Sequence, residues 1–419
     1  MSSQTFSEEV VRRPTCRVCG GSELEPILSL GHIPLANGFL RSPGEFAAER
    51  SYPLELHFCP RCSLLQLLDV VNPEAMFRHY VYVTGTSSTM AVHNRALARA
   101  LVQLLILRPG ELVVEVGSND GSLLRCFAEH GLRTLGIDPA RNLAAEATAS
   151  GIETVSEFFT HTLARRLRDE RGPVRAMVAN NVLAHQDDPR DFLSGCRELL
   201  TDDGIITLEV PYVGDILDRL EYDTVYHEHL SYFSMTALLR LAEAANLAVV
   251  RIDRLLVHGG SLRLYLSRSE RGHAPAVCAM EADERSAGLA DVARYRQFAA
   301  DVLERRDELV GLLERLTAEG KRVAAYGAPA KGNILLNFCR IDTRLVHFTV
   351  DKNPRKIGLF TPGAHLPVLE VSALGASETA PDYVLILPWN LAEEIMQQEH
   401  VFRDRGGRFI IPVPRAQVV

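Results

Sequence analysis

The sequence lacks any apolar run close to the roughly 20 residues that a membrane-spanning helix requires. The opening MSSQTFSEEVVRRPT also lacks the apolar segment of a secretory signal. Basic residues are not in excess, and a net charge of −8 gives no support to a surface that binds nucleic acid. We therefore expect a cytoplasmic protein whose partners include neither a membrane nor a nucleic acid.

The chain of 419 residues is too long for one ordinary hydrophobic core. Its composition, 47% hydrophobic and 23% charged, is typical of a globular protein. We expect three domains, at residues 1–75, 76–280 and 281–419. Neither a heptad repeat nor a basic tail indicates a protein partner, so we expect a monomer or a small homo-oligomer.

Four of the eight cysteines are scattered through apolar segments and are expected to be reduced and buried. The other four form two C-x-x-C pairs, CRVCG and FCPRC; these are Cys16, Cys19, Cys59 and Cys62. A thioredoxin-like redox pair would not explain the second pair, and no βαβ pattern surrounds either one. We therefore predict one tetrahedral Zn²⁺ site. Because the protein supplies all four ligands, the ion should be structural.

The middle segment alternates short buried strands with helices. Strands are predicted at residues 111–117, 133–138, 174–180 and 204–210. A hairpin, LAVVRIDRLL and SLRLYLSR joined through HGG, should add an antiparallel strand at one edge. This pattern predicts an α/β fold with a doubly wound parallel sheet.

The last segment is expected to begin with one long charged helix at residues 281–319. The stretch KRVAAYGAPAKGN then opens a second strand–turn–helix unit, and further buried strands follow it. These features predict a smaller, Rossmann-like α/β domain at the C-terminus.

The stretch VVEVGSNDGSLL forms a glycine turn between a predicted strand and a predicted helix, where a nucleotide-like ligand sits in open α/β sheets. The candidate ligand-binding residues of this turn are Glu115, Gly117, Asn119, Asp120 and Gly121. The third glycine of G-x-G-x-x-G is missing, and carboxylates suit a cationic ligand better than a phosphate. Asp138, at the end of the next strand, is placed to accept from ribose hydroxyls.

Acid, glycine turn and second acid together resemble the class I methyltransferases that use S-adenosylmethionine (SAM). A nicotinamide-binding Rossmann domain fits less well because of the missing glycine. The resemblance places SEFF near the adenine, and it places NNVLAH where methyl donor and acceptor meet. Further cofactor contacts are therefore expected at Phe158, Asn180 and Asn181.

The stretch DTVYHEHLSYF concentrates titratable groups after the fifth predicted strand. His227 and His229 are two residues apart, which does not match the helical zinc motif, so metal binding is the weaker interpretation. Ordinary loop histidines remain an alternative, above all for His227. A histidine base, a supporting carboxylate and a tyrosine donor are the groups needed to remove a proton next to a carbonyl. The acceptor should then be a carbon atom.

The order of motifs resembles the sugar C-methyltransferases of antibiotic deoxysugar pathways, over nearly the whole chain. The matching motifs are CRVCG, FCPRC, YVYVTGTSS, VVEVGSNDGSLL, NNVLAH, VYHEHLSYFS, HGGSLR, YGAPAKGNILLNF and DYVLILPWN. The resemblance implies a zinc-binding domain, a SAM-binding domain and a C-terminal Rossmann-like domain. It also implies methylation at C3 of a dTDP-linked 4-keto-6-deoxyhexose.

By the same resemblance His229 is the base, and Glu228 and Tyr226 support it. Tyr80 and His185 are carried into the active site by their motifs. Tyr82 is an alternative to Tyr80, because the YVY repeat permits either register, and is otherwise a substrate contact.

The turn in YGAPAKGN matches neither the Walker A nor the nicotinamide pattern. Lys331 and Asn333 are candidate contacts for the nucleotide half of the substrate, with structural packing as the alternative. Arg263 in HGGSLR is a second candidate, because its guanidinium forks toward phosphate. A bifunctional methyltransferase and NADPH-dependent 4-ketoreductase, and a methyltransferase with a non-sugar acceptor, remain alternative functions.

Overall fold

The computed structural model describes residues 10–78, 80, 83, 85, 88–255, 259–375 and 380–419. The chain divides into two compact units, each assembled from separate stretches. Unit 1 contains the residues up to Glu25, Phe58–Gly214 and Leu230–Val292, and unit 2 contains Pro26–His57, Asp215–His229 and Ala293–Val419. The N-terminal segment therefore contributes to both units. The three domain boundaries predicted from the sequence stay a prediction.

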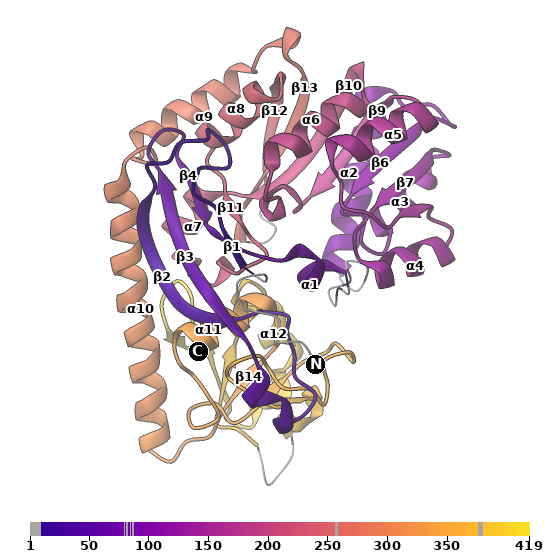
Figure 1. Ribbon diagram of the computed structural model, residues 1–419. Coiled ribbons are helices and arrows are strands. Elements are labelled where there is room, and N and C mark those ends of the chain that lie inside the picture. Colours follow the sequence, from indigo (N-terminus) through magenta and orange to yellow (C-terminus); the bar gives the residue numbers. More distant parts are fainter. Residues whose placement is uncertain are drawn as a thin grey trace, which may run out of the picture. The chain divides into compact units, whose positions relative to one another are not determined.

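Unit 1 is built on a seven-stranded sheet in the order β12-β13-β10-β9-β6-β7-β8 (Figure 1). Its strands are β6 (Leu112–Val116), β7 (Arg133–Ile137), β8 (Thr154–Val155), β9 (Val174–Asn180), β10 (Leu200–Pro211), β12 (Leu247–Leu255) and β13 (Ser261–Arg268). β13 is antiparallel to both of its neighbours, and the other pairs are parallel. The predicted doubly wound sheet is confirmed, with one difference: the antiparallel strand lies one position in from the edge.

Helices fill the connections of this sheet, as expected when parallel strands need long crossovers. They are α2 (Ser88–Leu105), α3 (Ser122–Ala128), α4 (Arg141–Ala149), α5 (His161–Arg171), α6 (Pro189–Leu199) and α8 (Met235–Ala244). The apolar side of α2, with Leu97 and Leu101, packs with Val113 of β6, Phe127 of α3 and Tyr265 of β13 in one buried cluster. This packing fixes α2 and α3 near the ends of β6.

The N-terminal part of unit 1 adds two short antiparallel pairs. β1 (Val10–Arg12) pairs with β5 (Asp69–Val71), and β4 (Leu64–Leu67) pairs with β11 (Ser231–Tyr232). A short helix, α1 (Pro73–Phe77), follows β5 and is capped by the side chain of Asn72.

Unit 2 contains a six-stranded sheet in the order β16-β15-β14-β17-β18-β19. The strands are β14 (Val323–Tyr326), β15 (Thr349–Val350), β16 (Val368–Leu369), β17 (Tyr383–Ile386), β18 (Arg408–Ile411) and β19 (Gln417–Val418). All pairs are parallel except the last. With α11 (Ala330–Phe338), α12 (Ala392–Gln398) and α13 (His400–Asp404), this sheet forms the predicted Rossmann-like domain. β2 (Glu25–Pro34) and β3 (Ser51–Cys59) are neighbouring strands that largely belong to unit 2.

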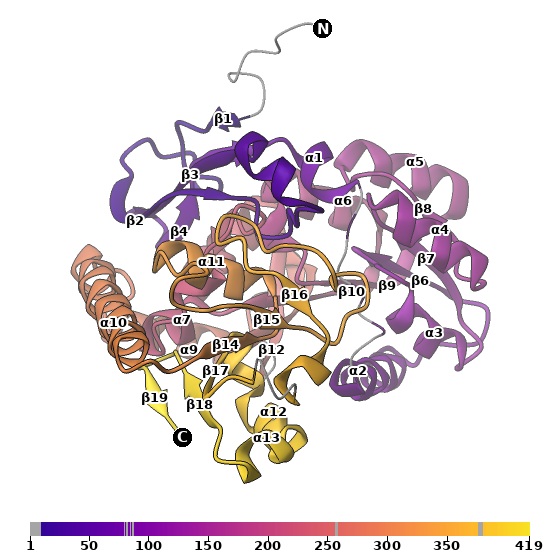
Figure 2. The same cartoon turned by 90° about the horizontal axis from the view of Figure 1, so that it is seen from below.

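The prediction of a single helix at residues 281–319 is wrong. Two helices occupy this region: α9 (Pro275–Ser286) and α10 (Val292–Ala318), the long helix seen nearly end-on in Figure 2. Gly288 lies between them with φ of +78°, a left-handed conformation that ends a helix. Within the described ranges, no helix combines the length and the apolar character needed to cross a bilayer.

Candidate functional site

The two C-x-x-C pairs converge on one point in unit 1. The ligand atoms of Cys16, Cys19, Cys59 and Cys62 all lie within 4.8 Å of one another. Sγ of Cys16 is 3.5 Å from that of Cys62, and Sγ of Cys19 is 3.4 Å from that of Cys59. A set of four thiolate donors at this spacing fits a tetrahedral zinc ion and provides its complete coordination.

Both pairs are held in the same kind of turn. Gly20 donates its N–H to the carbonyl of Cys16, and Ser63 donates to the carbonyl of Cys59, each at 2.9 Å. Gly20 and Ser63, each next to the second cysteine of its pair, have φ of +71° and +57°. The turns aim both cysteines of a pair at the same point. Hydrogen bonds among these thiols lower the pKa of Cys16 and raise the pKa of Cys59 and Cys62, because the groups lie close enough to share protons.

The glycine turn after β6 has the tight geometry that its sequence predicts. Gly117, Asn119 and Gly121 all have positive φ, of +70°, +51° and +75°. A Cβ atom on Gly117 would lie 2.4 Å from Cγ2 of Val182. The backbone of the turn therefore approaches the loop after β9 more closely than any other residue type would allow.

Asp138, at the end of β7, is buried and holds this turn. Its Oδ2 accepts the N–H of Asn119 at 2.8 Å, and its Oδ1 accepts the N–H of Ala140 at 2.9 Å. Burial raises the pKa of Asp138, and the two backbone donors offset part of that effect. Asp120 is engaged locally, since it accepts the N–H of Ser122 at 3.2 Å and pairs with Arg125 at 3.2 Å.

Several buried polar atoms at the carboxyl ends of the parallel strands have no hydrogen-bond partner among the described residues. They are Oε2 of Glu115, Oγ of Ser118, Oγ of Ser156 and Oδ1 of Asn180. Buried polar groups in a folded protein are normally paired, so these atoms indicate a polar ligand at this edge. Burial, and then the charges of Asp138 and Asp120, raise the pKa of Glu115 well above its ordinary value. A cationic ligand would offset the repulsion between these carboxylates. These residues therefore fit the ammonium and ribose groups of SAM.

The two remaining cofactor predictions lie in loops close to this edge. Asn181 has φ of +56° and donates its N–H to the carbonyl of Glu209 at 2.8 Å. Phe158 follows β8, and the guanidinium of Arg78 lies 4.7 Å from the centroid of its ring. Their contact with SAM stays a prediction.

A buried ion pair on β10 was not foreseen from the sequence. Arg263 of β13 donates from Nε to Oε1 of Glu209 at 2.7 Å, and His93 of α2 lies 2.9 Å from Oε2. Burial raises the pKa of Glu209, but His93 and Arg263 outweigh it and the pKa falls below its ordinary value. The guanidinium fork of Arg263, which we expected to contact phosphate, is thus occupied by a carboxylate of its own sheet. A charged residue inside the apolar strand GIITLEV was the available signal.

Two of the predicted catalytic residues, Tyr80 and His185, meet around one aromatic ring. The ring of Phe77 lies 6.0 Å from that of Tyr80 and 5.6 Å from that of His185, between centroids. Asn142 of α4 holds the backbone of Tyr80 by accepting its N–H at 3.1 Å and donating to its carbonyl at 2.8 Å. Tyr82 lies outside the described residues.

In unit 2, Tyr226 and His229 form a directed pair. Nδ1 of His229 lies 2.9 Å from the carbonyl oxygen of Thr224, which can only accept, so Nδ1 carries the proton. Nε2 is then the acceptor, and the hydroxyl of Tyr226 donates to it at 2.8 Å. The carbonyl of Thr224 thus leaves the lone pair of His229 on Nε2, the nitrogen that can receive a proton.

The two neighbours of His229 in the motif have different environments. Glu228 is buried, and its Oε1 accepts a hydrogen bond from Nδ2 of Asn37 at 2.7 Å. His227 is 1% exposed, and its Nε2 lies 3.3 Å from the carbonyl of Tyr52. Burial lowers the pKa of His227 to about 4, so this ring is neutral near pH 7. His227 therefore has the environment of a packed core histidine.

Lys331 lies at the start of α11, among acidic and aromatic groups. Its Nζ is 4.1 Å from the centroid of the Trp389 ring, whose Nε1 donates to Asp223 at 2.7 Å. Burial lowers the pKa of Lys331, whereas Asp223 and Glu221 act to raise it. Burial also raises the pKa of Glu221 to about 8, although Lys331 opposes it.

The side chain of Asn333 is fully buried, and its Nδ2 donates to the carbonyl of Ala36 at 2.7 Å. This contact gives Asn333 a packing function, and substrate contact stays a prediction for both Asn333 and Lys331.

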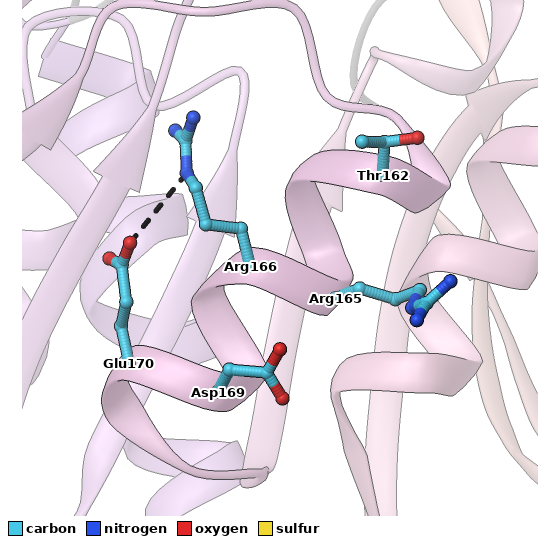
Figure 3. Close-up of a pocket in the computed structure, with 5 residues that line it drawn as sticks. All are labelled: Thr162, Arg165, Arg166, Asp169 and Glu170. Carbon is cyan, nitrogen blue, oxygen red and sulfur yellow. Dashed lines mark ion pairs between the residues drawn. The ribbon is translucent and has the colours of Figure 1, made fainter.

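A hollow on the surface of α5 has no connection with these groups (Figure 3). It is lined by Thr162, Arg165, Arg166, Asp169 and Glu170, all from the same helix. Arg166 is paired with Glu157 at 2.5 Å and lies 3.8 Å from Glu170. Exposed pairs of this kind are ordinary features of a solvated helix.

Three family models match the chain in succession. Their descriptions are "Putative zinc binding domain" for residues 16–77, "Methyltransferase domain" for residues 90–252 and "C-methyltransferase C-terminal domain" for residues 256–414. The C-methyltransferase NovU of Streptomyces niveus is 38% identical over 406 residues, which cover 96% of this chain and 96% of NovU.

Solved structures resemble a smaller part of the chain. Magnesium protoporphyrin IX methyltransferase ChlM from Synechocystis PCC 6803, with bound SAM, is 16% identical, and the match covers 42% of this chain and 81% of that one with a TM-score of 0.33. The PH0226 protein from Pyrococcus horikoshii OT3 is 13% identical, covering 45% and 95% with a TM-score of 0.36. Scores at this level support no inference about function.

Proposed function

The chain belongs to the SAM-dependent C-methyltransferase family, and we propose that it methylates C3 of a dTDP-linked 4-keto-6-deoxyhexose. The observation that carries the proposal is the directed pair of Tyr226 and His229, with Nε2 ready to accept a proton. A carbon atom carries no lone pair, so it must lose a proton before it can be methylated. Motifs resembling those of the deoxysugar enzymes support the choice of acceptor and a place in an antibiotic-type pathway.

In the proposed reaction, Nε2 of His229 removes the proton from C3, and the electrons of that C–H bond pass into the C4 carbonyl as an enolate. The buried Glu228 lies next to His229 in the chain, and its negative charge supports the imidazolium that forms. Because Nε2 has one lone pair, the hydroxyl of Tyr226 must first release it, and the oxygen of Tyr226 then accepts the hydrogen bond of the protonated Nε2. Proton removal therefore needs only groups of the Tyr226–His229 segment.

Hydrogen-bond donors stabilise the enolate oxygen, and we propose that Tyr80 and His185 are these donors. SAM supplies an electrophilic methyl group next to a positive sulfur. When SAM is bound, attack of C3 on that methyl group would break the carbon–sulfur bond and neutralise the charges of enolate and sulfonium. The residues that hold SAM are those of the glycine turn, with Glu115 and Asp138.

The zinc ion has a structural task in this proposal. Its four protein thiolates leave no coordination position for the sugar.

The nucleotide half of the substrate is assigned to unit 2, with Lys331 as its cationic contact. A ketoreductase function is less well supported, because a Cβ on Gly327 would lie 2.7 Å from Cδ of Pro388, which covers the turn after β14. The N–H of Ala328 in the same turn is already donated to Asp351 at 2.7 Å. A dinucleotide would need this turn open and its amides available.

We also propose that the enzyme works in the cytoplasm as a monomer or small homo-oligomer, with the nucleotide sugar as its partner. Of the scattered cysteines, Cys126, Cys196 and Cys339 are buried as expected, whereas Cys278 is exposed, so burial was wrongly predicted for that residue.

Proton exchange at C3 tests the base separately from methyl transfer. The enzyme is incubated in D₂O with the 4-keto sugar nucleotide and S-adenosylhomocysteine, and loss of the C3 proton signal is followed by NMR. We expect exchange with the wild type, none above background with His229→Asn, and the same SAM affinity for both by calorimetry. Exchange near the wild-type rate in His229→Asn would remove His229 as the base. Failure to methylate any of a panel of keto-sugar nucleotides, with SAM bound, would reject the acceptor class.

A further inference from the structure

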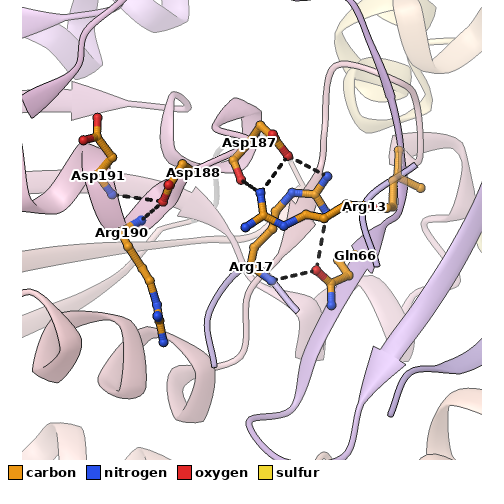
Figure 4. Close-up of polar contacts among 8 residues, drawn as sticks. Arg13, Arg17, Gln66, Asp187, Asp188, Arg190 and Asp191 are labelled. Carbon is orange, nitrogen blue, oxygen red and sulfur yellow. Dashed lines mark hydrogen bonds and ion pairs between the residues drawn. The ribbon is translucent and has the colours of Figure 1, made fainter. Parts of the chain in front are cut away.

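The Cys16–Cys19 pair carries between its ligands a charged side chain that is directed into the protein. The side chain of Arg17 is 0% exposed. Burial of a guanidinium is costly, and partners for its charge and its N–H groups offset part of that cost. The partners of Arg17 therefore identify what this part of the chain is attached to (Figure 4).

Arg17 joins two segments that are far apart in the sequence. Its Nη1 donates to the carbonyl of Leu67 and, at 3.3 Å, to Oε1 of Gln66, both on β4. Its Nη2 forms an ion pair with Oδ1 of Asp187 at 3.2 Å, whereas its Nε has no hydrogen-bond partner among the described residues. Asp187 lies two residues after His185, in the loop between β9 and α6.

Two further contacts attach this loop and the first turn of α6 to the N-terminal segment. Arg190 donates from Nε to the carbonyl of Val18, between the cysteines, at 2.7 Å. Arg13 donates from Nη1 to the carbonyl of Asp187 at 2.7 Å. Asp188 caps α6 by accepting the N–H of Asp191 at 3.0 Å, so the start of α6 is fixed together with the loop.

The other end of the loop is reached through β4. The N–H of Leu67 is donated to the carbonyl of Leu230 at 3.0 Å, and the N–H of Leu230 is donated to the carbonyl of Ala184 at 2.8 Å. Contacts that start at Arg17 thus reach Ala184 on one side of His185 and Asp187 on the other. They form a closed ring of hydrogen bonds and ion pairs around this short segment.

We infer that the Cys16–Cys19 turn sets the position of residues 184–187, and that Arg17 is the positioning residue for His185. Bonds from zinc to sulfur would hold the backbone of the turn in place. The Cα atom of Arg17 and the carbonyl of Val18 belong to that backbone and would be held with it. The metal then acts on the reaction without touching the substrate. The effect on catalysis rests on the task proposed for His185. The structural link between the Cys16–Cys19 turn and residues 184–187 does not.

Asp187→Ala in the zinc-loaded, full-length enzyme tests the link, because Asp187 is 46% exposed and its replacement leaves the core intact. We expect faster amide hydrogen exchange in the peptide spanning 182–191 and unchanged exchange in the peptide spanning 112–121. Zinc content and SAM affinity should stay at wild-type values, and kcat should fall roughly 10- to 100-fold. Asp187→Asn, which keeps an acceptor oxygen, should recover part of the loss.

Asp203→Ala is the matched control. Asp203 is 59% exposed and pairs with Arg175 at 2.9 Å, without contact to the loop, so all readouts should stay at wild-type values. Removal of zinc by a chelator should reproduce the faster exchange at 182–191 while 112–121 stays protected. Unchanged exchange in both Asp187→Ala and the zinc-free enzyme would overturn the link. Faster exchange with an unchanged kcat would instead reject the task proposed for His185, and with it that part of the proposed function.

Discussion

The hydroxyl of Tyr226 lies 2.8 Å from Nε2 of His229, while Nδ1 of the same ring is 2.9 Å from the carbonyl of Thr224. The carbonyl of Thr224 accepts a hydrogen bond from Nδ1, so Nδ1 carries the proton. The hydroxyl of Tyr226 donates to Nε2, so Nε2 is the nitrogen with the lone pair. When Nε2 is protonated it becomes a donor, and the oxygen of Tyr226 can accept its new hydrogen bond. The same two residues therefore satisfy the ring before and after proton transfer.

Tyr226→Phe should slow C3 proton exchange and methylation by roughly 10- to 100-fold, because the protonated Nε2 of His229 loses the oxygen that accepts its hydrogen bond. SAM affinity should not change, since the cofactor residues are elsewhere in the sequence. NMR of exchange in D₂O and calorimetry of SAM binding measure the two effects. Tyr383→Phe, at the first residue of β17 and outside the proposed site, is the control. A wild-type exchange rate in Tyr226→Phe would contradict the prediction.

SAM binding should weaken as the pH falls, because Glu115 must be ionised to meet the ammonium group. Burial raises the pKa of Glu115 well above 4.5, so this loss should occur at a higher pH than for an ordinary glutamate. Calorimetry from about pH 8 to about pH 5 would follow it. Glu115→Gln should bind SAM more weakly at the upper pH and show a flatter dependence. An equally steep dependence in that variant would assign the titration to another group.

Gly117→Ala should abolish measurable SAM binding. The new Cβ would lie 2.4 Å from Val182, and φ of +70° is unfavourable for alanine. Backbone strain alone should cost roughly 1 to 2 kcal/mol of unfolding free energy. Gly151→Ala has a similar φ of +89° with no atom within 4 Å of the added Cβ, so it shows the strain without the collision. Equal SAM affinity in both variants would contradict the close approach.

His227 should make the protein less stable in mild acid. Its pKa is about 4 in the folded protein and 6.5 ordinarily, so the unfolded chain binds the extra proton. The stabilisation is complete above about pH 6.5 and is lost as the pH falls toward about 4, by roughly 3 kcal/mol. Denaturant unfolding across this range would show a shallower loss for His227→Phe. The exposed His400→Phe should keep the wild-type slope, and the same slope in His227→Phe would refute the assignment.

Trp389 is the one tryptophan of the sequence and reports on Lys331, whose Nζ lies 4.1 Å from the ring centroid. If the diphosphate of the substrate attracts Lys331, the ammonium group of Lys331 moves away from the indole ring of Trp389, and the fluorescence of Trp389 changes. Titration with dTDP should therefore change the emission, and Lys331→Met should weaken dTDP binding roughly tenfold. Lys352→Met, a surface variant, is the control. Unchanged dTDP affinity in Lys331→Met would place the nucleotide elsewhere.

Features encoded by neighbouring residues could be read from the sequence. The strand predicted at residues 174–180 is observed as Val174–Asn180, because a run of apolar residues between turn signals has few other solutions. The metal cluster and the glycine turn were found for the same reason: each motif contains its own turn. The break between α9 and α10 was missed because the charged pattern continues across Gly288.

The strand–helix alternation, the thiolate ligands and the residue types around the glycine turn are encoded locally, so they could be predicted from the order of residues. Other contacts depend on how the chain folds in three dimensions: Glu209 with Arg263 and His93, His229 with Thr224, and Arg17 with Asp187. Such partners are chosen by burial: a charge enclosed in the core must be matched by whichever group the folded chain brings within reach. The spacing of residues along the chain therefore does not predict which groups will pair.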